Sequence, residues 1–313
     1  MKSHRKWTAL LLALLTAVCL SSPVSAAGLI DSDEELRLTV SYTDGDTPLS
    51  GARFSLYLVA EADAYGELTV TEPFSLFNVD IRGENDDAWR TLAFTLEGYV
   101  LREQVTPSDS GTTRADGSLS FPTGSKTLTP GLYLVLGERL VQGGMYYDAV
   151  PFLALLPAQN LQKNVWVYRQ LVSPKHESGK NEPDEGSLEV LKIWKDSGCE
   201  KDRPDSVTVQ LLRNGKVYDT AVLSARNNWR YRWTGLDLRS RWTVTETVPE
   251  GYTVEITREG GVIAVTNRRG SGSQKPGGGL PQTGQLWWPV PVLLTAGLAL
   301  TAAGLIRRRR NRP

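Results

Sequence analysis

One alternating stretch decides the fold of this chain: Leu188-Glu189-Val190-Leu191-Lys192-Ile193-Trp194. Because successive side chains of a β-strand point to opposite faces, Leu188, Val190 and Trp194 share one face. Alternation of this kind predicts a half-buried strand. Lys192 is in phase with these apolar residues, so a charged side chain stands where a hydrophobic one is expected.

Two later stretches carry the same irregularity. The stretch from Trp242 to Val248 alternates, and Glu246 falls on its apolar face. The stretch from Ile263 to Asn267 also alternates, and Asn267 itself falls on the apolar face. Taken singly, each polar residue fits a strand end that leans toward solvent. Since burying an unpaired lysine or glutamate is costly, three such residues in one domain are explained most economically if their side chains meet.

Side chains of these three types can form a covalent bond when they meet. Burial disfavours charge, so it drives Lys192 toward the neutral amine, a nucleophile, and Glu246 toward the protonated acid. The acid can polarise the amide of Asn267 and relay protons to departing ammonia, while contact raises the effective concentration of amine and amide. The expected product is an isopeptide crosslink from Lys192 to Asn267, with Glu246 as catalyst.

Five segments of residues 187–268 form a recognisable series, and they are Lys192-Ile193-Trp194, Val207-Thr208-Val209-Gln210-Leu211, Asn228-Trp229-Arg230-Tyr231, the run from Thr245 to Tyr252, and Val265-Thr266-Asn267. Together they resemble a Cna B-type domain of Gram-positive surface proteins and pilins. The resemblance covers the whole second domain and implies the same crosslink with the same three roles. The stretch from Trp242 to Thr247 also resembles the pilin E-box, with tryptophan in place of its first tyrosine.

The rest of the ectodomain is expected to be mainly β as well. Residues 28–172 contain alternating strands. A helical insertion, an amphipathic helix packed on a sheet, is predicted where apolar residues recur between Trp89 and Val100. The segments Pro48–Tyr57 and Pro130–Leu134 resemble the SpaA-like N-terminal domain of sortase-assembled pilins. In residues 187–268, short strands with turns at Arg213-Asn214-Gly215 and Pro249-Glu250-Gly251 predict an antiparallel sandwich. The expected fold class is two Ig-like or prealbumin-like β-sandwich domains in tandem, followed by a C-terminal transmembrane helix.

A polar stretch with proline and glycine, residues 173–186, is predicted to be the linker between the two domains. The spacing from Trp166 to Lys175 resembles the pilin motif, whose lysine is joined to the threonine of the next subunit. Ser173 and His176 depart from the tyrosine and asparagine of that motif. Lys175 is therefore a candidate pilin-motif amine, and the alternative is a solvated linker lysine.

The two ends of the chain carry sorting signals. Residues 1–26 have a basic start, an apolar stretch and small residues, which is typical of a signal peptide cleaved after Ala26 or Ala27. Residues 269–279 form a predicted flexible spacer. The next five residues, Leu280, Pro281, Gln282, Thr283 and Gly284, resemble the LPxTG motif that a sortase recognises, and the resemblance implies cleavage between the last two. An uncharged run, residues 286–306, is long enough to span a bilayer, and the basic tail 307–313 is expected to stay cytoplasmic.

Charge and composition exclude several classes of function. The full chain carries 35 basic and 35 acidic residues. The expected processing removes eight basic and no acidic residues, so the mature ectodomain is acidic and is not expected to bind nucleic acid. Cys199 is the cysteine left after Cys19 departs with the signal, so no intrachain disulfide is expected. No metal-ligand spacing and no phosphate-binding or dinucleotide-binding glycine pattern occurs, so no metal and no cofactor are expected.

Two functions remain open from the sequence. The first is a structural pilin subunit anchored to peptidoglycan, with a sortase, a peptidoglycan precursor and other pilin subunits as partners. The second is a wall-anchored adhesin whose first domain binds a host or neighbouring-cell ligand. An enzyme is not expected, because no catalytic set beyond the self-limited Lys192, Glu246 and Asn267 is found. The role of Lys175 separates a backbone pilin from a basal subunit or an adhesin.

Overall fold

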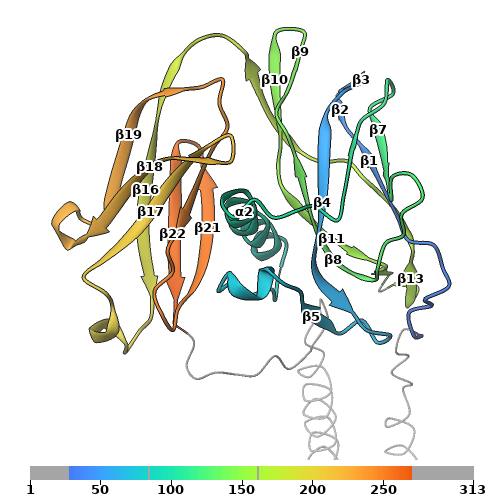
Figure 1. The fold of residues 1–313 in the computed structure, drawn as a ribbon, viewed down its shortest axis with the longest axis horizontal. Coiled ribbons are helices and arrows are strands. Elements are labelled where there is room, and N and C mark those ends of the chain that lie inside the picture. Colours follow the sequence, from blue (N-terminus) through green and yellow to red (C-terminus); the bar gives the residue numbers. More distant parts are fainter. Residues whose placement is uncertain (1–27, 84, 161, 270–313) are drawn as a thin grey trace, which may run out of the picture.

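A computed structural model describes residues 28–83, 85–160 and 162–269 (Figure 1). The predicted signal peptide, the sorting motif, the apolar run 286–306 and the basic tail lie outside these residues. Within them, no helix is both long and apolar enough to cross a membrane. The described chain is mainly β, as expected, with one long helix, α2 (Asp86–Arg102).

The N-terminal part of the structure comprises residues 28–180. Besides α2 it contains the 3-10 helix η1 (Phe74–Leu76) and the strands β1 (Arg37–Ser41), β2 (Thr43–Asp44), β3 (Thr47–Pro48), β4 (Arg53–Ala62), β5 (Leu68–Val70), β6 (Asp109–Thr112), β7 (Ser118–Phe121), β8 (Gly131–Gly137), β9 (Leu140–Gln142), β10 (Met145–Ala149), β11 (Phe152–Leu156), β12 (Ala158–Asn160), β13 (Val165–Val167), β14 (Arg169–Val172) and β15 (His176–Lys180). The main sheet has the order β11-β8-β4-β5, with β6 paired to β4, and a smaller sheet has the order β14-β1-β7. Alternating residues such as Leu38, Phe54 and Phe121 fill the core between them.

The C-terminal part is a two-sheet sandwich. Its elements are β16 (Glu185–Lys195), η2 (Glu200–Asp202), β17 (Ser206–Arg213), β18 (Lys216–Ser224), η3 (Ala225–Asn227), β19 (Arg230–Asp237), β20 (Trp242–Glu246), β21 (Thr253–Glu259) and β22 (Val262–Arg268). One sheet has the order β19-β16-β22-β21, and the other has the order β18-β17-β20. The predicted turn at Asn214 and Gly215 joins β17 to β18, and both residues adopt the positive φ angles that a tight hairpin turn requires.

Strand direction departs from the expectation in one place. The sandwich was predicted to be antiparallel, but the first strand β16 and the last strand β22 are parallel neighbours. A parallel pair needs a long crossover connection, and the five strands between β16 and β22 provide it. The two ends of the domain are therefore adjacent in the same sheet.

Helix α2 forms where the apolar spacing predicts it. The side chain of Asn85 caps its N-terminus by accepting a hydrogen bond from the backbone N–H of Ala88 at 2.9 Å, and Asp86 and Asp87 suit the positive end of the helix dipole. Its central residues are buried on all sides, and they are Leu92, Ala93, Thr95, Leu96, Glu97, Gly98, Tyr99 and Val100. A helix buried all round lies between two layers. α2 contacts β8 and β11 on one side and β20 and β21 on the other (Figure 1).

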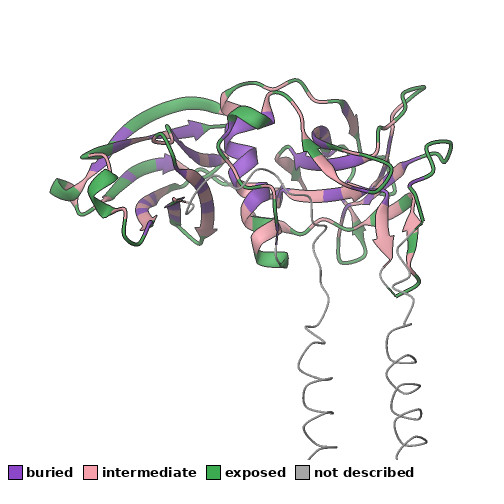
Figure 2. Cartoon of the chain, turned by 90° about the horizontal axis from the view of Figure 1, so that it is seen from below, coloured by how far each residue is buried: buried purple, intermediate pink, exposed green. Residues whose placement is uncertain are grey.

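The two parts share a hydrophobic core through this helix. One continuous cluster contains Val59 and Leu134 of the N-terminal part, Leu96 of α2, and Val244 and Ile256 of the C-terminal part. The sequence predicted two tandem domains joined by a linker. The structure instead packs the two parts against opposite sides of α2, and Figure 2 shows buried residues running through the region between them.

Half of the predicted linker, residues 173–186, lies in strands instead. β15 pairs antiparallel with β10 from Met145–Lys180 to Ala149–His176, and β16 already begins at Glu185. The polar composition concealed an edge strand: β15 ends the sheet β15-β10-β9, and three of its five residues are exposed. The ring of its first residue, His176, packs edge-on against Tyr42 and Tyr147, with ring centroids 5.6 and 5.3 Å away.

Candidate crosslinking site

The two sheets of the C-terminal sandwich bring the three polar residues together. β16 and β22 run side by side, with Lys192 opposite Val265 and Trp194 opposite Asn267. β20 of the facing sheet ends at Glu246. The side chains of Lys192 and Glu246 are fully buried, and so is Asn267. All three point inward, as the alternation along each strand predicts.

Lys192 and Glu246 lie in direct contact inside the sandwich. Nζ of Lys192 is 3.4 Å from Oε1 of Glu246. The amine donates hydrogen bonds to the backbone oxygen of Val265 at 3.1 Å and, weakly, to that of Ile193 at 3.4 Å. Neither carboxyl oxygen of Glu246 and neither amide atom of Asn267 makes a hydrogen bond of good geometry to the described residues. Since each unsatisfied buried polar atom costs about 1–3 kcal/mol, this cluster is expensive if it only packs.

Burial changes the protonation of this pair. Desolvation lowers the pKa of Lys192, and the nearby charge of Glu246 only partly opposes it. Desolvation likewise raises the pKa of Glu246, against the opposing effects of Lys192 and Asn267. Both shifts favour the neutral amine and the protonated acid. The site thus holds a nucleophile, a proton donor and an amide that has ammonia as its leaving group.

Aromatic rings close the site on the Lys192 side. The ring of Trp194 lies 4.6 Å from Nζ of Lys192. Trp229 and Tyr252 pack edge-on against Trp194, with ring centroids 5.4 and 5.2 Å away. The hydroxyl of Tyr252 donates to the carboxylate of Asp196 at 3.0 Å. This aromatic cover keeps water from the amine and sustains its low pKa.

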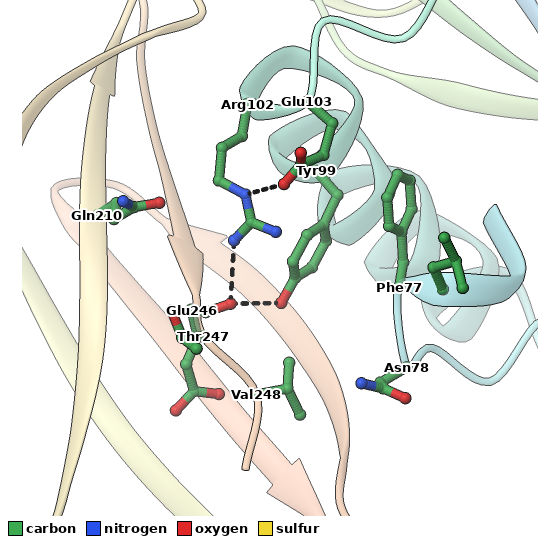
Figure 3. A pocket seen from close by; sticks show the side chains of 10 residues that line it. Phe77, Asn78, Tyr99, Arg102, Glu103, Gln210, Glu246, Thr247 and Val248 are labelled. Carbon is green, nitrogen blue, oxygen red and sulfur yellow. Dashed lines mark hydrogen bonds and ion pairs between the residues drawn. The ribbon is translucent and has the colours of Figure 1, made fainter. Parts of the chain in front are cut away.

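Sequence reasoning missed the contribution of α2 to this region. The hydroxyl of Tyr99 donates to the backbone oxygen of Glu246 at 2.9 Å, and Arg102 donates to the same oxygen at 3.3 Å (Figure 3). Beside them lies a cavity of about 460 Å³, lined in part by Phe77 and Val248. One signal in the sequence is that residues 92–101 of α2 contain a single charged residue, Glu97, and so few polar positions indicate a second packing partner.

The lysines of the N-terminal part show no comparable arrangement. The sequence offers only Lys126 and Lys163 between residues 28 and 172. Lys126 is half exposed, and its amine lies 2.8 Å from Oδ1 of the buried Asp109. Burial raises the pKa of Asp109, but hydrogen bonds from Lys126, Thr123 and Ser110 outweigh it, and the net pKa is lowered. An ionised carboxylate beside a solvated ammonium is an ordinary ion pair, so no crosslink is expected there.

The other candidate residues, Lys175 and the sorting motif, are not part of this buried cluster. Lys175 is exposed, just before β15, and its backbone oxygen accepts a hydrogen bond from the N–H of Val150 at 2.8 Å. Its backbone is therefore fixed to the N-terminal part, while its side chain reaches solvent. The sorting motif, Leu280 to Gly284, lies outside the described residues. Among the residues that the structure does describe, no cluster of histidine, cysteine or acidic side chains could hold a metal ion.

The candidate site lies in a segment that is similar to a known domain family. Residues 188–268 match the Cna protein B-type domain family. The collagen adhesin of Staphylococcus aureus is 36% identical over 100 residues, which cover 29% of this chain and 8% of the adhesin. The chain thus spans less than a tenth of the length of that curated relative.

Solved structures are similar to this chain at lower sequence identity. A single B repeat unit of the collagen-binding surface protein of Staphylococcus aureus aligns at 17% identity over 75% of this chain and 98% of its own, with a TM-score of 0.26. The full-length major pilin SpaD of Corynebacterium diphtheriae aligns at 13% identity over 77% of this chain and 65% of its own, with a TM-score of 0.29. These TM-scores are too low to support a shared arrangement of the whole chain.

Proposed function

We propose that this chain is a structural, pilin-like protein of the Gram-positive cell surface that fastens its C-terminal domain with an isopeptide bond between Lys192 and Asn267. One observation carries the proposal: Lys192, Glu246 and Asn267 are buried together between the two sheets of a region that matches the Cna B-type domain. A cluster kept only for packing would leave four buried polar atoms unsatisfied. A crosslink removes the charge of Lys192 and turns the amide of Asn267 into part of the link.

The position of the bond suits a load-bearing role. β16 and β22 are the first and last strands of the domain, and they are parallel neighbours. A pull on the two ends of the domain shears this pair directly. With Cys199 as the sole cysteine of the expected mature chain, no disulfide can resist that shear, whereas an amide between the two strands can. The reaction happens once per molecule, so the chain is not an enzyme in the usual sense.

The same proposal includes covalent anchoring. The signal peptide exports the chain, the apolar run 286–306 retains it, and a sortase cleaves after Thr283 and transfers the threonyl group to a peptidoglycan precursor or to another pilin subunit. The match to a collagen adhesin supports a cell-surface setting. The N-terminal part is then the pilin-type domain that the resemblance of residues 48–57 and 130–134 implies.

Intact mass spectrometry of the purified protein tests the crosslink. The wild type is expected to weigh one ammonia less than its sequence, because forming the amide releases the nitrogen of Asn267. The Asn267→Ala variant should show its full mass, whereas Asn228→Ala, at an exposed asparagine of the same domain, should still lose ammonia. A soluble, folded wild type at full mass contradicts the proposal.

Polymerisation through Lys175 is a separate expectation. Its amine is exposed on a fixed backbone, where a sortase-bound threonyl group of another subunit can reach it. When the chain is made with its cognate sortase, wall extracts should show a ladder of species that survives boiling in detergent. Lys175→Ala should collapse this ladder to a wall-linked monomer that keeps the Lys192–Asn267 bond.

Lys180 provides the matched control for this experiment, because it is an exposed lysine five positions further along the same segment. Lys180→Ala should leave the ladder unchanged. A wild type that runs only as a monomer beside its sortase would favour the second function, a wall-anchored adhesin or basal subunit in which the C-terminal domain is a stalk.

A further inference from the structure

The register of β20 turns the backbone carbonyl of Glu246 toward α2. The N–H of Thr247 bonds to the backbone oxygen of Thr208 at 3.0 Å, so Thr247 faces β17. In an antiparallel pair, the next residue along turns its N–H and C=O away from the partner strand. Glu246 therefore directs its carbonyl to the free edge of β20, which is the end strand of its sheet. Proteins protect such edges in several ways, one of which is to cover them with a helix or loop.

Helix α2 occupies that free edge. Its residues Thr95, Gly98, Tyr99 and Arg102 are spaced i, i+3, i+4 and i+7, so they form one face of the helix. Tyr99 and Arg102 donate to the carbonyl of Glu246, as Figure 3 shows. At the other end of this face, the hydroxyl of Thr95 accepts a hydrogen bond from the N–H of Ile256 in β21 at 2.8 Å. The helix thus bridges the edge strands of both sheets.

The close approach depends on a glycine inside the helix. A Cβ atom at Gly98 would lie 2.8 Å from Cγ2 of Thr245 and 3.1 Å from the backbone oxygen of Val244. Glycine in a helix interior costs about 1 kcal/mol relative to alanine, so its presence here is consistent with a tight contact between α2 and β20. Arg241, just before β20, adds a buried ion pair to Glu97 of the same helix at 2.5 Å.

We propose that Tyr99 is a positioning residue for the crosslinking reaction: it holds the main chain of Glu246 from the neighbouring part of the chain, and so fixes the carboxyl between Lys192 and Asn267. This inference rests on the proposed function. Glu246 is the last residue of its strand, and only the N–H of Thr247 bonds to β17 beyond it before the chain leaves the sheet. Without the Tyr99 hydroxyl, only the longer hydrogen bond from Arg102 holds this carbonyl, and general acid catalysis loses rate when the acid is free to move.

The proposed reaction balances without any proton or atom from Tyr99. Nζ of Lys192 forms a bond to Cγ of Asn267, the bond from Cγ to Nδ2 breaks, and ammonia leaves with protons relayed by Glu246. Burial raises the pKa of Tyr99, so its hydroxyl stays protonated and donates to the carbonyl throughout. Tyr99 takes no proton and touches no reacting atom.

The test compares two variants that each remove one hydrogen bond between α2 and the C-terminal part. Tyr99→Phe removes the bond to Glu246 and keeps the ring that stacks on Phe77 at 5.3 Å. Thr95→Val removes the bond to Ile256, which lies in a different strand. The full chain is made by cell-free translation, synthesis is stopped, and aliquots are quenched in denaturant. Intact mass then gives the fraction that has lost ammonia at each time and pH.

Tyr99→Phe is expected to slow the reaction on the order of tenfold, the equivalent of one well-formed hydrogen bond. The wild-type rate should be bell-shaped in pH, because it needs a neutral Lys192 and a protonated Glu246. Tyr99→Phe should lower the maximum and leave the two limbs in place, since Tyr99 acts on the main chain. Thr95→Val should react within about twofold of the wild type.

Equal slowing by both variants would overturn the inference, because it would mean that only the stability of the interface matters. A Tyr99→Phe variant that reacts at the wild-type rate would overturn it as well. A wild type that never loses ammonia would instead refute the proposed function, so the two failures are distinct.

Discussion

Replacing Glu246 with glutamine is expected to leave Lys192 and Asn267 unlinked and to lower the free energy of unfolding by at least about 4 kcal/mol. Glutamine has nearly the same shape but cannot donate and accept protons as a carboxyl does, so the amine and amide stay separate. The full sequence mass and a lower midpoint in chemical denaturation, followed by circular dichroism, are the two measurements.

The size of the effect follows from chain entropy. A bond between Lys192 and Asn267 closes a loop of about 75 residues, and in the disulfide analogy such a loop stabilises the folded state by about 4 kcal/mol. The glutamine variant carries a second cost, because Lys192 remains buried without its acidic partner. Lys192→Met removes the amine as well as the link, so it should lose the first contribution and avoid the second.

Glu189 supplies the matched control, since it lies three residues before Lys192 on β16. Its side chain is partly exposed and pairs with Arg230 at 3.5 Å. Glu189→Gln should still lose ammonia and should change stability by less than about 1 kcal/mol. If Glu246→Gln protein retained the lighter mass, another group would have to be the catalyst, and the role assigned to Glu246 would be wrong.

The inward phase of Lys192, Glu246 and Asn267 could be predicted from the sequence because strand alternation is strict. A side chain in a two-residue period has only two faces to choose from, and the apolar neighbours identify the buried one. The same logic predicted α2, since the spacing of Leu92, Leu96 and Val100 fits a single buried stripe. Local periodicity was sufficient to predict the buried side chains of an element wherever only one of its faces is buried.

The sequence did not predict the packing of an element that contacts two other parts of the chain. α2 was expected to cover one sheet, but Tyr99 and Thr95 on its other face contact the C-terminal part. A periodicity analysis finds the strongest stripe and does not reveal a second one made of glycine, threonine and tyrosine. β15 was missed for a related reason, because His176–Lys180 is polar and only its pairing with β10 makes it a strand. Tertiary pairing of this kind leaves little local signal.

The shared core has a mechanical consequence for the proposed load-bearing role. Two domains on a flexible linker would align separately under load. Here β15 ties the connecting segment to β10, and α2 packs on strands of both parts. A pull along the chain therefore reaches the β16–β22 pair through a packed interface, and the crosslink and the interface resist it together.

Replacing Thr283 with alanine is expected to abolish covalent attachment to the cell wall. The resemblance of Leu280 to Gly284 to the LPxTG motif implies that a sortase forms a thioester with the carbonyl of Thr283 and passes it to a cell-wall or pilin amine. Without the threonine, the chain should remain with the membrane through residues 286–306 or appear in the medium. Cell fractionation followed by digestion of the purified wall measures the bound fraction.

Gln282→Ala is the matched control, because the motif leaves this position open, and it should release as much protein from the wall digest as the wild type does. Both variants should still show the mass of the Lys192–Asn267 bond, since that bond forms within the folded domain and needs no second protein. Protein of the Thr283→Ala variant recovered in undiminished amount from the wall digest would mean that the pentapeptide is not the anchoring signal. The apolar run would then act as a membrane span, and attachment to the wall would need another residue. Under the proposed function, the packing around Lys192 makes one amide bond and a sortase acting at Thr283 makes the other. Glu246→Gln should therefore remove the first bond and leave the second, and Thr283→Ala should do the reverse.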